Sequence, residues 1–156
     1  MQAIKFLLVA VITTFLTFTK AYAIDPNDIV GRYWNPDRDG IIEIFKTGRT
    51  FSGRIIWSAK REIDTFNPNA SLKGRNMLGV PFLKGFKFDG KGKWVDGSVY
   101  AFDNGRTYSG NIRLDGNKLK MRGFVGVSLL GRTVTFIRYP NSRSLPSGGF
   151  SLKQAN

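Results

Sequence analysis

Residues 93–125, KWVDGSVYAFDNGRTYSGNIRLDGNKLKMRGFV, contain three strand patterns separated by two short turns. The turns are Asp103-Asn104-Gly105 and Asp115-Gly116-Asn117, which are rich in residues able to adopt the positive φ angles of tight hairpins. Each strand pattern alternates apolar and polar side chains, which is typical of a sheet with one buried and one solvated face. The stretch therefore predicts three consecutive antiparallel strands.

The alternation also assigns side chains to faces. One face carries Tyr108, Gly110, Ile112, Leu114, Leu119, Met121, Gly123 and Val125, and the other carries Thr107, Ser109, Asn111, Arg113, Lys118, Lys120 and Arg122. The first set predicts the core side, and the basic residues of the second are typical of a solvated face. Arg122 lies at the apolar end of its strand, so it could instead turn towards the mouth of a barrel.

Similar patterns continue on both sides of this stretch, with Gly, Asn and Asp between them. Strands are expected at 31–35, 41–47, 51–58, 84–88, 93–102, 106–114, 117–125 and 132–139. Eight strands in simple succession predict an all-β fold, a single up-and-down antiparallel β-barrel. Residues 59–78 interrupt the pattern and predict a long loop or short helix between the third and fourth strands, capped by Asn69 or Ser71.

The segment before the first strand has the pattern of a secretory signal peptide. Lys5, an apolar run over residues 6–18 and the triplet Ala21-Tyr22-Ala23 match its three regions, with cleavage before Ile24. The run is too short to span a bilayer, so export to the periplasm or beyond is expected. The expected organisation is a signal peptide at 1–23, a barrel at 24–139 and a flexible C-terminal tail at 140–156.

The chain has no cysteine and no histidine. Disulfides, thiolate nucleophiles, serine–histidine systems and the usual zinc sites are therefore excluded, and neither a metal nor a cofactor is expected. Most acidic residues lie in turn-like settings, where aspartate is favoured for local hydrogen bonds. The composition favours a non-catalytic protein. The remaining enzymatic alternative would combine Glu43 or Asp103 with Tyr100 or Tyr108 as acid and base.

Two apolar segments lie between strands, where a solvated loop would be polar. They are residues 78–83, LGVPFL, and residues 125–130, VGVSLL. Each could fold inward and plug one end of a barrel. Alternatively, they form the lips of an apolar pocket or a contact surface for a partner or membrane.

The first and last strands resemble the closing arrangement of lipocalins. Gly31-Arg32-Tyr33-Trp34 supplies a glycine and a tryptophan, and Arg138 supplies a basic residue on the final strand. In that family, an arginine of the last strand covers a tryptophan at the barrel base, a contact between a cation and a π face. Here the spacing is G-x-x-W instead of the usual G-x-W.

A wider resemblance covers nearly all of the chain that follows the signal peptide. It rests on IEI (42–44), GRIIW (53–57), LG (78–79), GSVY (97–100), GRTY (105–108), LKMRGFVG (119–126) and LLGRT (129–133). These segments resemble the bacterial exported family catalogued as domain of unknown function 2147. The resemblance implies a small lipocalin-like (calycin-type) barrel in the bacterial envelope, and it implies no reaction.

The first functional hypothesis is non-covalent binding of a small apolar or amphipathic ligand inside the barrel. Arg122 and Arg132 are expected to pair with an anionic group of that ligand, because guanidinium is a two-pronged donor. Glu43 could face the interior if Ile41 and Phe45 do, and a buried carboxylate there would need a partner such as Arg54 or Arg132; the alternative is an exposed glutamate on the strand. Trp57, Phe82, Tyr100, Tyr108 and Leu129 are the expected apolar and aromatic lining. The alternative is an interior filled with side chains, and the oligomeric state is left open.

The second hypothesis is a cationic module that binds acidic envelope or host polymers, such as lipopolysaccharide or glycosaminoglycan. The chain carries a formal net charge of +13 and loses only Lys5 and Lys20 with the signal peptide. Such a charge attracts polyanions over long range. No specific nucleic-acid partner is expected, because the stacked aromatic layout of a single-strand binder is missing.

Overall fold

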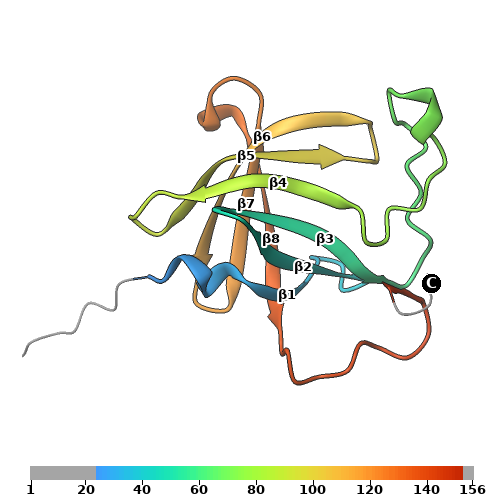
Figure 1. The fold of residues 1–156 in the computed structure, drawn as a ribbon, viewed down its shortest axis with the longest axis horizontal. Helices are drawn as coiled ribbons and strands as arrows, with labels where there is room; N and C mark the ends of the chain where they lie inside the picture. The colour runs from blue at the N-terminus through green and yellow to red at the C-terminus, as the bar shows by residue number, and fades with distance from the viewer. Residues whose placement is uncertain (1–23, 153–156) are drawn as a thin grey trace, which may run out of the picture.

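A computed structural model describes residues 24–152 and shows a closed barrel of eight antiparallel strands (Figure 1). The strands are β1 (Gly31–Trp34), β2 (Gly40–Thr47), β3 (Thr50–Ser58), β4 (Pro81–Phe88), β5 (Lys93–Ala101), β6 (Arg106–Asp115), β7 (Lys118–Phe124) and β8 (Arg132–Tyr139). Each strand pairs with the next, and the β1–β8 pairing closes the sheet. The predicted up-and-down barrel is confirmed.

The predicted hairpins and strand limits agree closely with the structure. Gly105 and Gly116 have φ angles of +71° and +57°, as the two tight turns require. The largest difference in limits is at β4, which begins at Pro81 instead of residue 84. Pro81 pairs with Arg54 in the first position of the strand, where its missing N–H is tolerated.

One end of the barrel, called the base, is closed by the chain that precedes β1. This segment forms the short helix η1 (Pro26–Ile29), whose Ile29 is fully buried. The Tyr33 hydroxyl donates to the Ile29 carbonyl at 2.8 Å, and Trp94 Nε1 donates to the Pro26 carbonyl at 3.0 Å. Burial raises the pKa of Tyr33 to about 12, so its hydroxyl remains a donor. The base is therefore sealed by apolar packing and satisfied hydrogen bonds.

The prediction that Arg138 covers Trp34 is wrong. The Arg138 guanidinium lies 4.7 Å from the ring centroid of Tyr33 and donates to the Val30 carbonyl. Side chains alternate along β1, so Tyr33, two residues after Gly31, faces the core whereas Trp34 faces away from it. Gly31 has a φ of +143°, and a Cβ there would lie 2.7 Å from Arg138 Nη1, so the glycine leaves room for the arginine.

We expect Arg138→Met to lower the free energy of unfolding by about 1–2 kcal/mol, because it removes a cation–π contact and hydrogen bonds to the η1 segment. Urea unfolding monitored by circular dichroism measures the change. Arg113→Met on the exposed face of β6 is the matched control, with an expected change within about 0.5 kcal/mol. Equal losses in the two variants would contradict the proposed role of Arg138.

The base half of the barrel is filled with large apolar side chains. Its buried core includes Phe51, Phe86, Trp94, Ile112, Leu119 and Phe136. The Phe51 and Trp94 rings meet edge to face with centroids 6.5 Å apart, a favourable aromatic geometry. These side chains pack against one another, so the core of the base half is filled as the filled-interior alternative predicts, and a cavity of about 760 Å³ lies beside it between η1 and the β2–β3 and β4–β5 turns.

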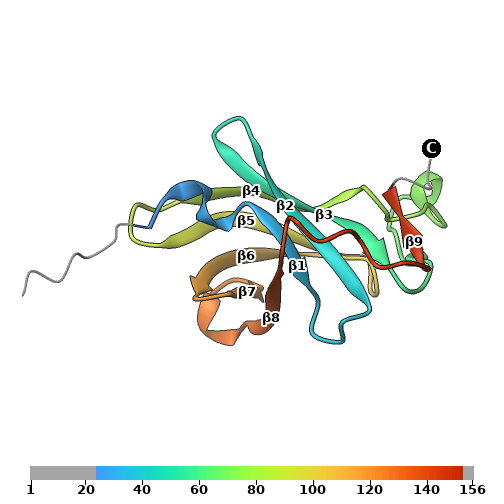
Figure 2. The same ribbon diagram turned by 90° about the horizontal axis from the view of Figure 1, so that it is seen from below.

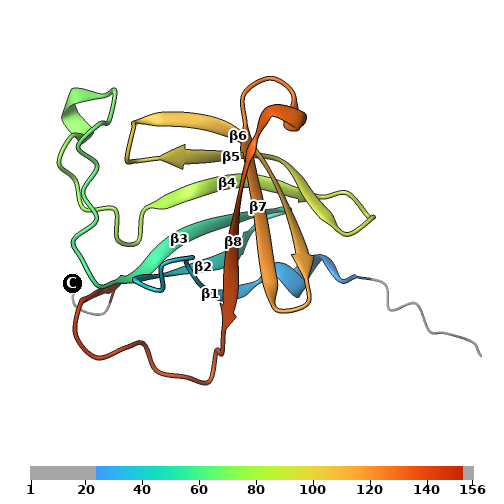
Figure 3. The same cartoon turned by 180° about the vertical axis from the view of Figure 1, so that it is seen from behind.

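A second apolar cluster lies apart from the barrel interior. Ile41, Ile56, Trp57 and Tyr139 are buried there, with Trp34, Leu145 and Leu152 packed against them. The chain after β8 runs around the outside of the barrel to reach β3 (Figure 3). It ends in β9 (Phe150–Ser151), which pairs with Trp57 and Ser58 (Figure 2).

The prediction that residues 140–156 form a tail without regular structure is therefore wrong for its described part. The Trp57 indole donates to the Gly148 carbonyl at 2.9 Å, and Leu145 and Leu152 pack onto the second cluster. These apolar residues are separated by glycine and proline and show no period. Their packing partners are distant in sequence, so no local pattern indicates the contact.

The interruption between β3 and β4 contains the short helix η2 (Ala70–Leu72). The Asn69 side chain accepts a hydrogen bond from the Ser71 backbone N–H. Of the two predicted caps, Asn69 and Ser71, Asn69 is therefore the one that caps the helix. Within residues 24–152, no helix has the length and apolar character needed to cross a membrane. The predicted signal peptide lies outside the described residues.

Candidate functional site

A pocket of about 510 Å³ opens at the end of the barrel opposite the base, which we call the pocket end. The β5–β6 turn and the β7–β8 loop meet there. The lining comprises Val99, Ala101, Asp103, Asn104, Tyr108, Met121, Gly123, Phe124, Val125, Leu130, Arg132 and Val134. The pocket is therefore built by β5, β6, β7 and β8 together with two of their connections.

The pocket exists because small residues occupy inward positions at this end. Ala101 and Gly123 line the pocket, whereas inward positions of the base half carry aromatic rings such as Phe51 and Trp94. A Cβ at Gly123 would find its nearest neighbour 3.8 Å away, so the space over this glycine is open. Val99, Met121 and Val134 form an apolar floor that is continuous with the core. The pocket therefore continues the barrel interior at this end.

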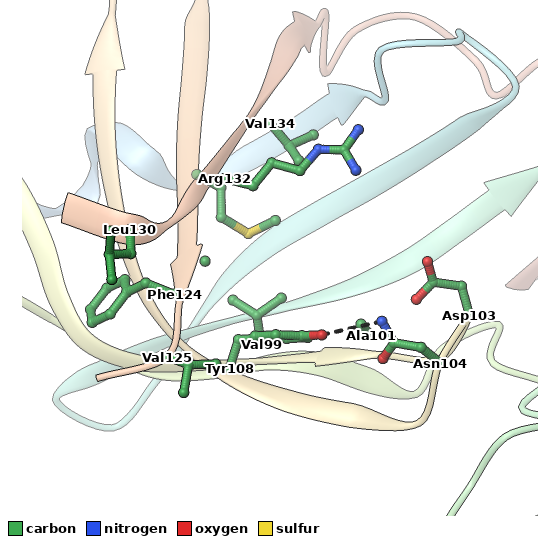
Figure 4. A pocket seen from close by; sticks show the side chains of 12 residues that line it. Val99, Ala101, Asp103, Asn104, Tyr108, Phe124, Val125, Leu130, Arg132 and Val134 are labelled. Atoms are coloured by element: carbon green, nitrogen blue, oxygen red, sulfur yellow. Dashed lines mark hydrogen bonds between the residues drawn. The ribbon is translucent and has the colours of Figure 1, made fainter. Parts of the chain in front are cut away.

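The polar groups of the pocket lie on one side of it. Figure 4 shows the side chains of Arg132, Asp103 and Asn104 on the side opposite Phe124 and Leu130. The Tyr108 hydroxyl accepts a hydrogen bond from Asn104 Nδ2 at 3.3 Å. Among the described residues, neither Arg132 nor Asp103 has a salt-bridge partner. The Arg132 guanidinium is thus available to an anionic group at the mouth.

Of the eight predicted ligand-binding residues, the structure places two in the pocket lining, Tyr108 and Arg132. Leu129 lies beside the pocket but is 85% exposed, and its neighbour Leu130 lines the wall instead. Val125, also part of the wall, is predicted to lie on the core face of its strand. That prediction is wrong, since β7 ends at Phe124 and Val125 is exposed.

Arg122 does not line the pocket. Its guanidinium donates to the carbonyls of Ser128 at 2.6 Å and Leu129 at 2.8 Å, and to Thr133 Oγ1 at 3.0 Å. Met121 beside it faces the core, so Arg122 faces outward by strand alternation. It holds the β7–β8 loop and is a positioning residue.

Glu43 lies outside the pocket as well. Ile42 and Ile44 on either side belong to the core, so the carboxylate faces away from the interior. It accepts from Arg54 Nη2 at 2.8 Å, so the pair with Arg54 forms on the outer face and not in the interior. The Arg54 guanidinium also lies 5.0 Å from the centroid of the Phe45 ring. This pair is a feature of the outer wall.

Trp57 and Phe82 pack against other apolar side chains and do not line the pocket. Trp57 belongs to the second apolar cluster, away from the pocket. Phe82 is buried and meets Phe102 edge to face at 6.4 Å. Leu83 is fully buried, and Leu78 and Val80 pack against the core, so residues 78–83 turn inward, although Pro81–Leu83 do so as part of the wall strand β4 and not as a plug. Residues 125–130 do the opposite, and their apolar side chains face solvent.

Tyr100 takes part in a buried polar network that sequence analysis missed. Its hydroxyl donates to Asp64 Oδ1 at 2.6 Å. Asp64 is fully buried, and its Oδ2 accepts from Asn67 Nδ2 at 2.6 Å and Arg75 Nε at 3.0 Å. The network fastens the β3–β4 segment to β5. Asp64 lies in an irregular stretch, so no spacing indicates its burial.

The electrostatics of this network follow from its donors. Burial alone would raise the pKa of Asp64, but the hydrogen bonds from Tyr100, Asn67 and Arg75 outweigh burial and lower it. Burial and the contact with Asp64 raise the pKa of Tyr100, so its hydroxyl stays a donor. Asp64 is therefore held as a carboxylate. It lies outside the pocket lining.

Comparison with solved structures finds a likeness to HP1028 from the human pathogen Helicobacter pylori, a protein described as belonging to the lipocalin family. The TM-score is 0.67 and the identity is 25%, over 73% of this chain and 84% of that one. The comparison with curated proteins finds no match. This chain and HP1028 therefore share a lipocalin-like fold.

Residues 31–138 match the model of a bacterial family, and this range includes β1 to β7, all of β8 except Tyr139, and the pocket between them. The chain belongs to the family described as an uncharacterized protein conserved in bacteria, DUF2147.

Proposed function

We propose that the chain is an exported lipocalin-like binding protein for a small, largely apolar ligand that carries an anionic group. The observation that carries the proposal is the half-filled barrel, in which an apolar pocket of about 510 Å³ has at its mouth the Arg132 guanidinium, which forms no salt bridge within residues 24–152. A pocket of this volume is within the range of small-molecule sites, about 300–1,000 Å³. The likeness to a lipocalin-family protein supports binding as the activity.

The residues in the pocket narrow the chemistry of the ligand. Val99, Met121 and Val134 favour an apolar body that excludes water. Arg132 favours a carboxylate or a similar anion, and the Tyr108 hydroxyl adds a polar contact. Asp103 on the same side opposes a second negative charge. An amphipathic molecule with a single anionic end fits this arrangement best.

We expect Arg132→Glu to weaken binding of 1-anilinonaphthalene-8-sulfonate, an apolar anionic fluorophore, by at least about tenfold. The reversal replaces an attraction at the mouth with a repulsion, beside the existing carboxylate of Asp103. Fluorescence titration measures the dissociation constant. Arg113→Glu on the outer face changes the net charge equally and is expected to alter binding by less than about twofold.

The uncharged fluorophore N-phenyl-1-naphthylamine separates the apolar site from its charge. Its affinity should be nearly unchanged in Arg132→Glu, and Gly123→Leu should abolish binding of both fluorophores, since the new side chain fills open space. If Gly123→Leu binds both as the wild type does, the pocket is not the site and the proposed function fails.

The strong positive charge supports a second candidate function, binding of acidic envelope or host polymers. Its specific support is an outer hollow of about 310 Å³ whose lining includes Lys93, Arg113, Lys120 and Arg122. Retention on heparin that is lost at modest salt, and that is the same for wild type and Gly123→Leu, would favour this function over the first.

A further inference from the structure

The β7–β8 loop, residues 125–130, is the most exposed apolar segment among the described residues. The side chains of Val125, Val127, Leu129 and Leu130 are 73%, 61%, 85% and 81% exposed. The loop projects beyond the ends of β7 and β8 (Figure 1). Exposed apolar clusters on small soluble domains usually mark an interaction surface.

The loop is held in this exposed form. Its short helix η3 (Ser128–Leu130) has the carbonyls of Ser128 and Leu129 fixed by the Arg122 guanidinium. A Cβ at Gly131 would lie 2.5 Å from the Gly123 carbonyl oxygen, so the loop returns close against the end of β7 and leaves no space for a side chain at this position. The apolar side chains are therefore presented to solvent by a defined backbone.

A basic hollow adjoins the loop on the outer face of the barrel. Its volume is about 310 Å³, and it is lined by Lys93, Asn111, Ile112, Arg113, Lys120, Arg122, Ser128 and Thr133. Four of these residues are cationic and none is acidic. Lys120 pairs with Asp115 at the edge of the hollow, while Lys93 and Arg113 make no salt bridge within residues 24–152. Ser128 joins the hollow to the apolar loop.

We propose that the 125–130 loop and this basic hollow together form a docking surface for a membrane leaflet that carries anionic phospholipid headgroups. The apolar side chains enter the boundary between headgroups and acyl chains, and the cations contact lipid phosphates. A soluble polyanion would use the cations but leave the leucines in water. A second copy of the chain would bring like charges together.

The inference does not depend on the pocket holding a ligand. Val125 and Leu130 nevertheless line the pocket as well as the loop, so docking would place the pocket mouth at the bilayer surface. The two proposals can fail separately, because fluorophore titration without lipid tests the pocket and vesicle binding tests the docking surface.

Co-sedimentation of the protein with vesicles of phosphatidylcholine mixed with phosphatidylglycerol tests the proposal, with pure phosphatidylcholine vesicles in parallel. We expect binding to the anionic vesicles, and a loss of affinity of at least about tenfold in Leu129→Ser/Leu130→Ser, which keeps the charge and alters only exposed side chains. Unchanged circular dichroism and melting temperature would show that this variant folds.

A charge-matched pair of variants tests the hollow. Lys93→Gln/Arg113→Gln should lower the affinity for anionic vesicles about tenfold. The control Lys46→Gln/Lys91→Gln removes two exposed cations near the base, one at the end of β2 and one in the β4–β5 turn. It should change the affinity for anionic vesicles by less than about threefold, because salt screens distant charges. Equal losses in both pairs would overturn the proposal in favour of general polyanion attraction.

Insertion of the loop has its own readout. The variant Leu129→Trp adds a tryptophan to the loop, and brominated lipid in the vesicles should quench the fluorescence of this added tryptophan. It should not quench the tryptophan added in the control variant Lys91→Trp, which lies at the base. Absence of vesicle binding by the wild type, or equal vesicle binding by wild type and the leucine double variant, would overturn the proposal.

Discussion

We expect replacement of Asp64 by alanine to lower the free energy of unfolding by about 3 kcal/mol, the largest effect of any substitution considered. The carboxylate is fully buried and accepts hydrogen bonds from Tyr100, Asn67 and Arg75. Its removal leaves these donors without a partner, and unsatisfied buried polar groups cost more than a lost contact. The β3–β4 segment would lose its attachment to β5.

Urea unfolding provides the measurement, with Asp115→Ala as the matched control. Asp115 also accepts from a cation, Lys120, but its side chain is 59% exposed, so its loss should cost at most about 1 kcal/mol. Tyr100→Phe removes a single donor of the network and should fall between the two. A cost for Asp64→Ala no larger than that for Asp115→Ala would contradict the structural role of the network.

The same carboxylate should make the protein sensitive to acid. Asp64 has a folded-state pKa below its unfolded value of about 3.9, so between these values the unfolded chain binds more protons. Its contribution to stability is therefore complete above about pH 5 and is lost as pH falls through the folded-state pKa. The fall in melting temperature between about pH 5 and pH 3 should be smaller in Asp64→Asn than in the wild type.

Gly97→Ala is expected to lower the free energy of unfolding by about 2–3 kcal/mol. A Cβ at Gly97 would lie 2.4 Å from two ring carbons of Phe86, which is buried in the core. Gly97 pairs with Gly110 across β5 and β6, and a Cβ at Gly110 would lie 2.9 Å from the same ring. The two glycines create the space that Phe86 fills, so an added methyl group must displace the ring.

Gly123→Ala is the matched control, because its Cβ would enter open space in the pocket, 3.8 Å from the nearest atom. Neither Gly97 nor Gly123 has a positive φ, so backbone strain does not separate them. Thermal and urea unfolding should show Gly123→Ala within about 0.5 kcal/mol of the wild type. A stability loss in the control comparable to that of Gly97→Ala would contradict the steric explanation.

The local features of the barrel were predictable because each depends on residues that are close in sequence. The DNG and DGN turns require positive φ angles, and the alternation between them fixes which side chains of β6 and β7 face inward. The position of Glu43 follows the same rule, since its two isoleucine neighbours face the core. An inward Glu43 would have required the opposite register.

The site was less predictable than the strands. Tyr108 and Arg132 line the pocket as expected, whereas Arg122 is used to fix the β7–β8 loop. The alternation of β7 places Arg122 outside, but sequence gives no sign that loop carbonyls would lie within its reach. The pocket depends on which inward residues of β5 to β8 lie side by side at this end, and that is set by the register of the whole sheet.

From its sequence alone this protein is an eight-stranded up-and-down barrel with a basic surface, because strand period, turn chemistry and charge are local properties. Only the tertiary structure decided that the base is filled and the other end hollow, that Arg138 covers Tyr33, and that Asp64 is buried. Each of these depends on contacts between segments far apart in the chain, and their distances are set by barrel closure and not by any neighbouring residue.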